Sequence, residues 1–278
     1  MEFTFSAEKA IKARHSTRTY EAKPLTSEDE EKLIAFSKTL TNPFDIPVSF
    51  RLLHSNEEWN AKALGTYGVI KGTKAFIGGT VPKGAFALEA FGYAFEKLIL
   101  YAASLGIGTC WLGGTFRRSG FEKAMGVKEG ELFPAISAIG YPAGKKSLTE
   151  ALFQRAMKSK QRKPWKELFF QHDFETPLTE EAAGKYALPL EMLRLGPSAV
   201  NKQPWRVVYA GGAYHFYEEK TLQKKDALDI QSVDLGIAIC HFHLTALENN
   251  LPGKFSVLPP KDIPLPANTQ YSISWITS

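Results

Sequence analysis

Apolar stretches recur in matched pairs along this 278-residue chain. Residues 92–106 and 236–250 are long apolar runs with alanines at matching places, which predicts one helix in each half of the chain. Residues 135–139 and 271–275 are short apolar runs interrupted by serine, which predicts one strand in each half. The two halves therefore follow one pattern.

Matched helix starts indicate the same duplication. Thr26 and Thr179 each follow Pro-Leu and precede acidic residues, so each hydroxyl is placed to cap a helix whose positive end the carboxylates favour. The segments 45–52 and 202–209 each lead through a proline into a further predicted strand. We expect two degenerate copies of one unit in a single chain.

The copies differ in a complementary way. Aligning them leaves about four extra residues in the second copy, and these fall within 196–201, which contains the turn Pro-Ser-Ala-Val-Asn at 197–201. The first copy carries a basic pentad, Arg-His-Ser-Thr-Arg at 14–18, whose expected counterpart at 167–171 has neither cation nor hydroxyl. If the copies pack as a symmetric dimer would, one cleft keeps both motifs and the other keeps neither.

The two motifs suit the two ends of one ligand. Arg14 and Ser16 offer the guanidinium and hydroxyl that commonly bind a phosphate, whereas the 197–201 turn suits a flat heteroaromatic ring. Together they indicate a single site for flavin mononucleotide (FMN). Taken separately, the pentad could be a solvated basic face, and the turn could simply follow a helix at 191–195.

Further motifs extend over nearly the whole chain. They are the longer turn Pro-Ser-Ala-x-Asn-x-Gln-Pro-Trp at 197–205, the glycine-rich segment 105–114, and Gly-Tyr-Pro at 140–142. With the basic pentad and Pro24-Leu25-Thr26, these segments resemble the FMN-dependent nitroreductase family, in a fused form with two copies per chain. The resemblance implies an α+β, three-layer fold with mixed sheets, in which residues 1–165 and 166–278 form an intramolecular pseudo-dimer.

The resemblance also implies roles for particular residues. Arg18 would lie beside the pyrimidine end of the flavin, Lys160 and Arg162 would be further phosphate ligands, and the backbone of Leu112 and Gly113 would contact flavin N5. The full predicted set is Arg14, His15, Ser16, Arg18, Leu112, Gly113, Gly114, Lys160, Arg162, Pro197, Ser198, Ala199 and Asn201. Alternatively, residues 112–114 form a helix C-cap, and residues 158–164 form a basic linker or a nucleic-acid patch.

The expected activity is a two-electron transfer from NAD(P)H through the flavin to a small nitroaromatic or quinone, in ping-pong order. Alternatives are ring-cleaving or dehalogenating flavin chemistry, and a flavin-binding or flavin-free protein without catalysis. Residues 59–67 and 116–121 are candidates for a substrate lid.

Composition is that of an ordinary globular enzyme, with 44% hydrophobic and 23% charged residues and a mild net charge of +5, which favours neither nucleic acid nor disorder. The two cysteines, Cys110 and Cys240, lack the spacing of a zinc cluster, so we expect no metal. Met1–Ala10 lacks the apolar core of a signal peptide, and Glu96 and Lys97 interrupt the longest apolar helix. We therefore expect a cytoplasmic monomer without membrane partners.

Overall fold

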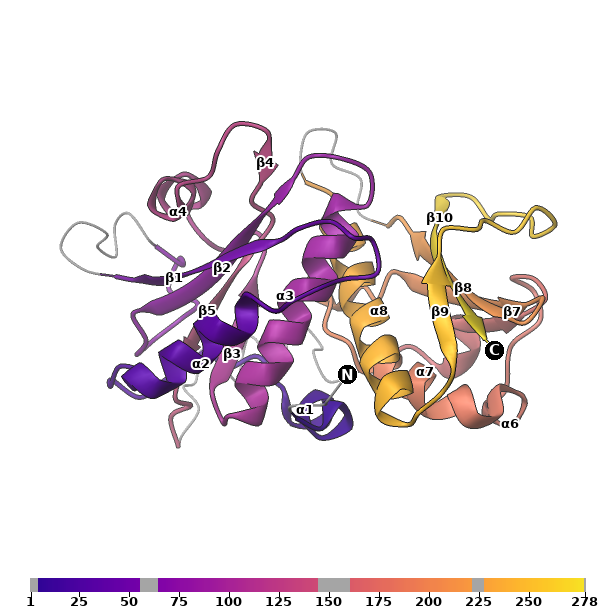
Figure 1. Cartoon of the computed structure of the whole chain (residues 1–278), viewed down its shortest axis with the longest axis horizontal. Coiled ribbons are helices and arrows are strands. Elements are labelled where there is room, and N and C mark those ends of the chain that lie inside the picture. Colours follow the sequence, from indigo (N-terminus) through magenta and orange to yellow (C-terminus); the bar gives the residue numbers. More distant parts are fainter. Residues whose placement is uncertain (1–4, 56–64, 145–160, 222–227, 278) are drawn as a thin grey trace.

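The computed structural model describes residues 5–55, 65–144, 161–221 and 228–277 (Figure 1). Its helices are α1 (Ala7–Ala13), α2 (Ser27–Ser37), α3 (Ala87–Ser104), α4 (Arg118–Met125), α6 (Glu180–Ala183), α7 (Ala187–Arg194) and α8 (Ile230–Glu248). Its strands are β1 (Ser49–His54), β2 (Ala75–Pro82), β3 (Gly108–Leu112), β4 (Glu131–Leu132), β5 (Ile136–Gly140), β6 (Phe169–Gln171), β7 (Trp205–Ala210), β8 (Ala213–Glu219), β9 (Gly253–Ser256) and β10 (Thr269–Thr277).

The two sheets repeat one strand order. The first runs β1-β2-β5-β3, and the second runs β7-β8-β10-β9, with every pair along these paths antiparallel. Strand β4 pairs with β2, and β6 adds a parallel strand outside β7, which makes the second sheet mixed. Since order and direction match strand by strand, the predicted duplication is confirmed in the fold.

Helices α3 and α8 lie between the two sheets, so the molecule has a central helical layer with a sheet on either side (Figure 1). The α+β, three-layer arrangement predicted from the sequence is therefore confirmed. The predicted helix caps are also present. Thr26 Oγ1 accepts from Asp29 N at 3.2 Å, and Thr179 Oγ1 accepts from Ala182 N at 3.1 Å.

The two central helices cross at a pair of equivalent glycines. A Cβ on Gly92 of α3 would lie 2.1 Å from Val233 O, and a Cβ on Gly236 of α8 would lie 2.1 Å from Glu89 O. Each glycine thus faces the carbonyl three residues before the other, as a two-fold axis through the crossing requires. Only glycine allows the backbones to approach this closely.

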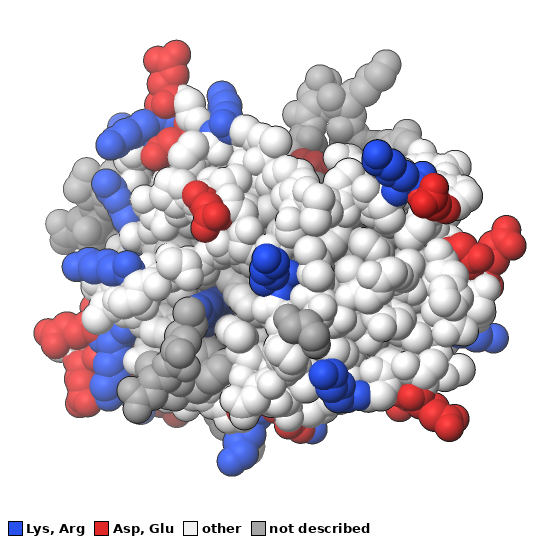
Figure 2. Space-filling model, turned by 45° about the vertical axis from the view of Figure 1, so that its right-hand side comes forward, with Lys and Arg blue, Asp and Glu red and all other residues white. Residues whose placement is uncertain are grey.

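The expectation that no run has the length of a membrane span is wrong for α8, whose 19 residues are long and apolar enough by composition. However, 83% of its apolar window is buried inside the protein, which is the setting of a core helix between two sheets. On the face drawn in Figure 2, basic and acidic side chains are intermingled around the rim, in keeping with the mild net charge.

One predicted correspondence between the copies is wrong. Ser16 and Thr17 run beside β3, through the bridge from Ser16 to Thr109 and the bond from Thr17 N to Thr109 O at 2.8 Å. The expected mirror segment 167–171 instead contributes β6, which pairs with β7 at the opposite edge of its sheet. Its apolar side chains explain the difference, because Leu168 and Phe169 are fully buried in the core of the second half.

We predict that Gly92→Ala lowers the free energy of unfolding by about 3 kcal/mol, because the new methyl group overlaps the α8 backbone. Gly236→Ala should have the same effect by the reciprocal contact. Urea denaturation measures both. Gly84→Ala is the control, since no atom lies within 4 Å of its added Cβ. Equal stability of all three variants would contradict the close crossing.

Candidate functional site

The basic pentad begins where α1 ends and lies between the two halves. Arg14 is the C-cap of α1, and the α1 residues Ala7, Ala10 and Ile11 are buried in a cluster made mainly by the second half. The Arg14 side chain is only 8% exposed, and its Nε makes no hydrogen bond among the described residues. The Glu96 carboxylate lies 3.6 Å from this Nε. The Arg14 guanidinium is thus paired in charge with Glu96, while its Nε keeps a hydrogen bond unused among the described residues.

Arg162 lies close enough to Arg14 for their positive charges to interact. Burial, followed by the positive charges of Arg14 and Arg194, lowers the pKa of Arg162 to about 10. The guanidinium still carries its charge at neutral pH, and its Nη2 donates to Leu195 O at 2.9 Å. The structure thus places two of the predicted phosphate ligands within reach of each other's charge, and Arg194 nearby is already paired with Glu191. Lys160, the remaining basic ligand, lies outside the described residues.

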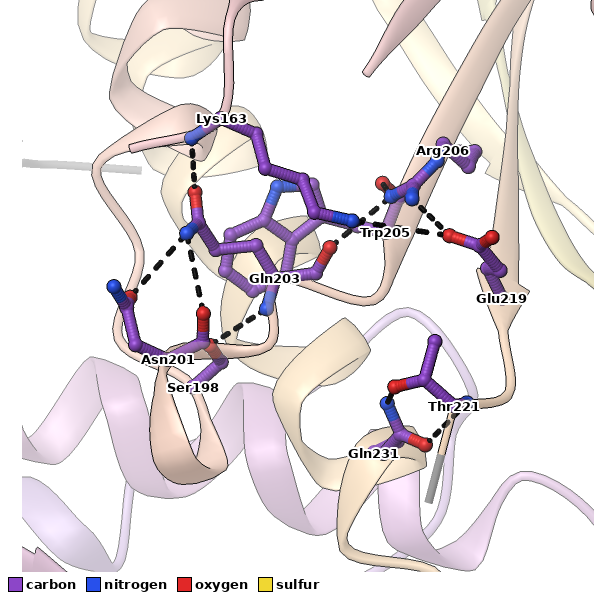
Figure 3. A network of polar contacts seen from close by, with 9 residues as sticks. All are labelled: Lys163, Ser198, Asn201, Gln203, Trp205, Arg206, Glu219, Thr221 and Gln231. Carbon is purple, nitrogen blue, oxygen red and sulfur yellow. Dashed lines mark hydrogen bonds and ion pairs between the residues drawn. The ribbon is translucent and has the colours of Figure 1, made fainter. Parts of the chain in front are cut away.

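The turn 197–203 has an unusual backbone. Val200, Asn201 and Gln203 have φ values of 44°, 56° and 51°, a left-handed conformation that non-glycine residues seldom adopt. Ser198 Oγ accepts from Gln203 N at 2.9 Å, and Ala199 N donates to both carboxylate oxygens of Asp234 at 3.0 Å. The first bond closes the turn on itself (Figure 3), and the bonds to Asp234 hold the turn against α8. Contacts with side chains therefore stabilise a left-handed backbone that glycine would adopt without strain.

The predicted ring-side segments of the two halves meet at the start of α8. A Cβ on Gly113 would lie 3.0 Å from Ile230 Cδ1, and Ile230 is the first residue of that helix. Asp234, about one helical turn further on, binds Ala199 of the 197–203 turn. Segments separated by some eighty residues in sequence are therefore neighbours across one helix end.

Other predicted residues are exposed or partly exposed. His15 is exposed, and its Nδ1 lies 3.2 Å from Ala13 O. Arg18 Nη1 donates to Ser16 O at 3.5 Å. Pro197 is partly exposed, and the space in front of Gly114 is open.

Two expectations about neighbouring segments need correction. The helix-cap alternative for residues 112–114 is wrong, because they end strand β3, and the helix end carries Gly106 instead, with a φ of 75°. Phe116 and Phe121 are buried in an aromatic cluster with Phe133, so the two ends of the candidate lid 116–121 belong to the core, whereas Arg117 and Ser119 between them are exposed. The other candidate lid, 59–67, lies mostly outside the described residues.

A buried polar network behind Arg14 joins the halves. Glu96 of α3 accepts from Trp111 Nε1 at 2.7 Å and lies 2.9 Å from His241 Nε2 of α8. The other ring nitrogen of His241 lies 2.9 Å from Met192 O. Both oxygen partners are acceptors, so each contact requires a proton between nitrogen and oxygen. The sequence signal for this network is a charged residue inside an apolar helix, and its role becomes visible only in the fold.

Acidic side chains gather beneath the turn. Asp234 is buried, and this burial raises its pKa well above the ordinary range. Burial likewise raises the pKa of Glu218 and of Glu89 to about 7, with further repulsion from Asp229. Glu218 is 3% exposed, and one of its oxygens accepts from Ser232 Oγ at 2.8 Å. These carboxyls add a protonation equilibrium near neutral pH to the region that holds the turn.

Comparison with known proteins identifies the class. The family described as "Putative TM nitroreductase" matches residues 7–246, which is most of the chain. The chain belongs to this nitroreductase family. None of the curated proteins matches it.

Three solved structures are similar to this chain, and the first of them agrees with it in fold. A protein described as a "putative nitroreductase" from Thermotoga maritima is 20% identical with a TM-score of 0.64, over 100% of this chain and 96% of that one. A "Putative NADH dehydrogenase/NAD(P)H nitroreductase" from Bacteroides thetaiotaomicron is 20% identical with a TM-score of 0.44, over 52% of this chain and 91% of that one. An "FMN-dependent Nitroreductase" from Clostridium difficile is 18% identical with a TM-score of 0.43, over 50% of this chain and 88% of that one.

The buried carboxyls predict a pH dependence of stability. Glu218 keeps its proton in the folded state up to about pH 7, whereas an unfolded glutamic acid loses it near its ordinary pKa of 4.5. Its contribution to stability is therefore fully present below about pH 4.5 and is lost as the pH rises through about 7. Glu218→Gln removes this titration, so the variant should gain stability relative to the wild type between about pH 5 and pH 8.

Urea unfolding at the two pH values measures the difference. Glu129→Gln, on an exposed side chain, controls for the loss of one carboxyl from the surface. A Glu218→Gln variant whose stability relative to the wild type does not change with pH would contradict the assignment.

Proposed function

We propose that this chain is an FMN-dependent oxidoreductase with one flavin site at the junction of its halves. Arg14, Ser16 and Arg162, together with Lys160, would hold the phosphate. Arg18, the backbone of residues 112–114 and the 197–201 turn would hold the ring. The observation that carries this proposal is the interaction of two partly buried arginines, Arg14 and Arg162, at the segment bonded to the turn, with Arg14 Nε making no hydrogen bond among the described residues.

The residues present fit a phosphate. Burial and the positive charge of Arg14 lower the pKa of Arg162, and an anion beside the two guanidinium groups would offset this unfavourable placement. Glu96 meets only part of this need, because its carboxylate oxygens also bind Trp111 and His241. A phosphate dianion accepts charge-assisted hydrogen bonds from several donors at once, which matches a site with an excess of positive charge.

Several features support one flavin per chain. The place equivalent to the start of α8 is the start of α3, and there Phe86 stacks on Phe44 with ring centroids 5.4 Å apart. Phe44 belongs to the segment before β1, which corresponds to the segment before β7 that contains the 197–203 turn. An aromatic pair thus lies where the first half would need an open turn to build a second site. The basic pentad lies beside β3, whereas no described segment pairs with the outer edge of β9, the equivalent strand of the second sheet.

A bound FMN would supply two-electron chemistry at N5, with NAD(P)H as donor and a small nitroaromatic or quinone as acceptor. The protein would bind the phosphate, orient the ring between the halves and, through Arg18, stabilise the negative charge that reduction places near flavin N1. We further propose that the chain acts as a monomer, because each half already provides the other with the contacts of a dimer partner. We also propose that it is cytoplasmic.

The phosphate assignment predicts the effect of two substitutions. Arg14→Ala and Arg162→Ala should each weaken FMN binding by about 2 kcal/mol, roughly thirtyfold, because each removes a charge-assisted hydrogen bond. Flavin fluorescence titration measures the affinity and also the stoichiometry, which we expect to be one FMN per chain.

Arg51→Ala is the matched control, because Arg51 lies on β1 at the opposite edge of the first sheet from β3. Wild-type affinity in both site variants would rule out the phosphate assignment. A wild-type protein that stays colourless after FMN is added would instead favour the flavin-free alternative.

The activity predicts a kinetic pattern. Initial rates of NAD(P)H oxidation, measured against the concentration of a quinone or nitroaromatic at several NAD(P)H concentrations, should give parallel double-reciprocal lines, since donor and acceptor use one ring face in turn. Intersecting lines would contradict the ping-pong order. NAD(P)H oxidation that no such acceptor stimulates would favour the ring-cleaving or dehalogenating alternative.

A further inference from the structure

The backbone on both sides of Arg162 is bonded to the 197–203 turn. Asn201 Nδ2 donates to Gln161 O at 3.0 Å, and Lys163 N donates to Gln203 Oε1 at 2.8 Å. Arg162 therefore projects from a short segment that is attached to the turn before and after it. The predicted phosphate ligand and the predicted ring-binding turn are one bonded unit.

Gln203 supplies the central contacts of this unit (Figure 3). It is only 3% exposed, and its Nε2 donates to Asn201 O at 3.2 Å while its Oε1 accepts from Lys163 N. The orientation of the amide is fixed by these partners, because a backbone N–H needs the oxygen and a carbonyl needs the NH₂ group. No other side chain of this size offers both a donor and an acceptor in that geometry.

A second route ties the same two segments together. Arg206 Nη1 donates to Gln203 O at 3.1 Å, and the Arg206 guanidinium also binds the Glu219 carboxylate. Glu219 in turn lies 3.9 Å from Lys163 Nζ. Gln203 is thus connected to Lys163 through its side chain and again through its main-chain carbonyl.

The strained backbone explains why so many bonds converge here. Three left-handed non-glycine residues in one turn cost on the order of 1 kcal/mol each, and such conformations persist only where surrounding contacts hold them. Gln203 is itself one of the three, and its amide bonds to the carbonyl of another, Asn201. Loss of the amide would therefore weaken both the turn and its attachment to the Arg162 segment.

We propose that Gln203 is a positioning residue that fixes Arg162 relative to the 197–203 turn, so that the phosphate and the ring of one flavin are bound at a set spacing. This inference rests on the proposed function. A ligand bound at both ends gains affinity only if the two subsites are held at the right separation, since the second contact is then made at high effective concentration. Gln203 would act on this separation and touch neither end of the ligand.

The test compares FMN with riboflavin, which has the same ring and no phosphate. In Gln203→Met, the ratio of FMN affinity to riboflavin affinity should fall about tenfold, because the phosphate contact no longer adds fully to the ring contact. Arg162→Ala should lower the ratio in the wild type and change it little in the Gln203→Met background. Such non-additivity distinguishes positioning from a general loss of stability.

Gln231→Met is the matched control. Gln231 is also a buried amide, 1% exposed, and it binds Thr221 N at 2.9 Å and Thr221 Oγ1 at 3.0 Å (Figure 3). Its substitution should lower stability and leave the FMN to riboflavin ratio unchanged. If Gln203→Met does not fold, Asn201→Gly removes the other attachment to the segment while glycine tolerates the left-handed φ, and the ratio should again fall.

The outcomes separate the two proposals. If the wild-type protein binds neither FMN nor riboflavin, the proposed function is wrong, and so is this inference. A wild-type protein that prefers FMN, together with a ratio unchanged in Gln203→Met and Asn201→Gly, overturns the positioning role and leaves the flavin site standing. A fall in the ratio that is fully additive with Arg162→Ala also overturns it, because independent effects do not pass through the Arg162 segment.

Discussion

The contact between α3 and α8 at Gly92 and Gly236 is the constraint on which the rest of the structure depends. It sets how close the two halves come, and every feature of the candidate site spans that junction. Because each glycine faces a backbone carbonyl of the other helix, the distance is fixed by main-chain atoms, which do not adjust as side chains do. Polar contacts across the junction therefore form between groups held at a constant spacing of α3 and α8.

The junction is two-fold in its backbone and unequal in its chemistry. Near one end, Glu96, His241 and Arg14 form a charged group, and the turn is bonded to Asp234. At the place that the two-fold axis relates to this one, near the start of α3, Phe44 and Phe86 form an aromatic pair. Fusion of two copies into one chain permits this divergence, since the two halves no longer share one sequence. One junction can keep polar groups while the other becomes part of the core.

Local signals in the sequence predicted the fold well. The Thr26 and Thr179 caps, the paired strands and the paired central helices all follow from short-range pattern, and the structure contains each of them. The pairing of 167–171 with β7 was not predictable in this way, because strand partners depend on contacts far apart in sequence. The left-handed backbone at Val200 also conflicts with local preference and exists only because distant groups hold it.

For the candidate site, residue type indicated Arg14 and the turn, the family resemblance added Arg162, and in the fold Arg162 lies on a segment bonded to the turn and within reach of the charge of Arg14. The supporting residues were harder to find. Glu96 and Asp234 appear in sequence as single charges in apolar helices, and nothing local shows that they face the pentad and the turn. Asn201 shows the same limit, because its amide binds the Gln161 backbone, a partner that residue type alone does not suggest.

The position of α1 has a consequence for the order in which the protein folds. This first helix packs in a cluster built mainly from residues after 168, and Glu8 N donates to the Glu248 carboxylate, 240 positions later in the chain. The ribosome must therefore release the chain as far as Glu248 before α1 can reach all of these neighbours. Contacts of such long range form slowly. Because Arg14 follows α1 directly, the basic pentad is held in place only after the second half has been synthesised.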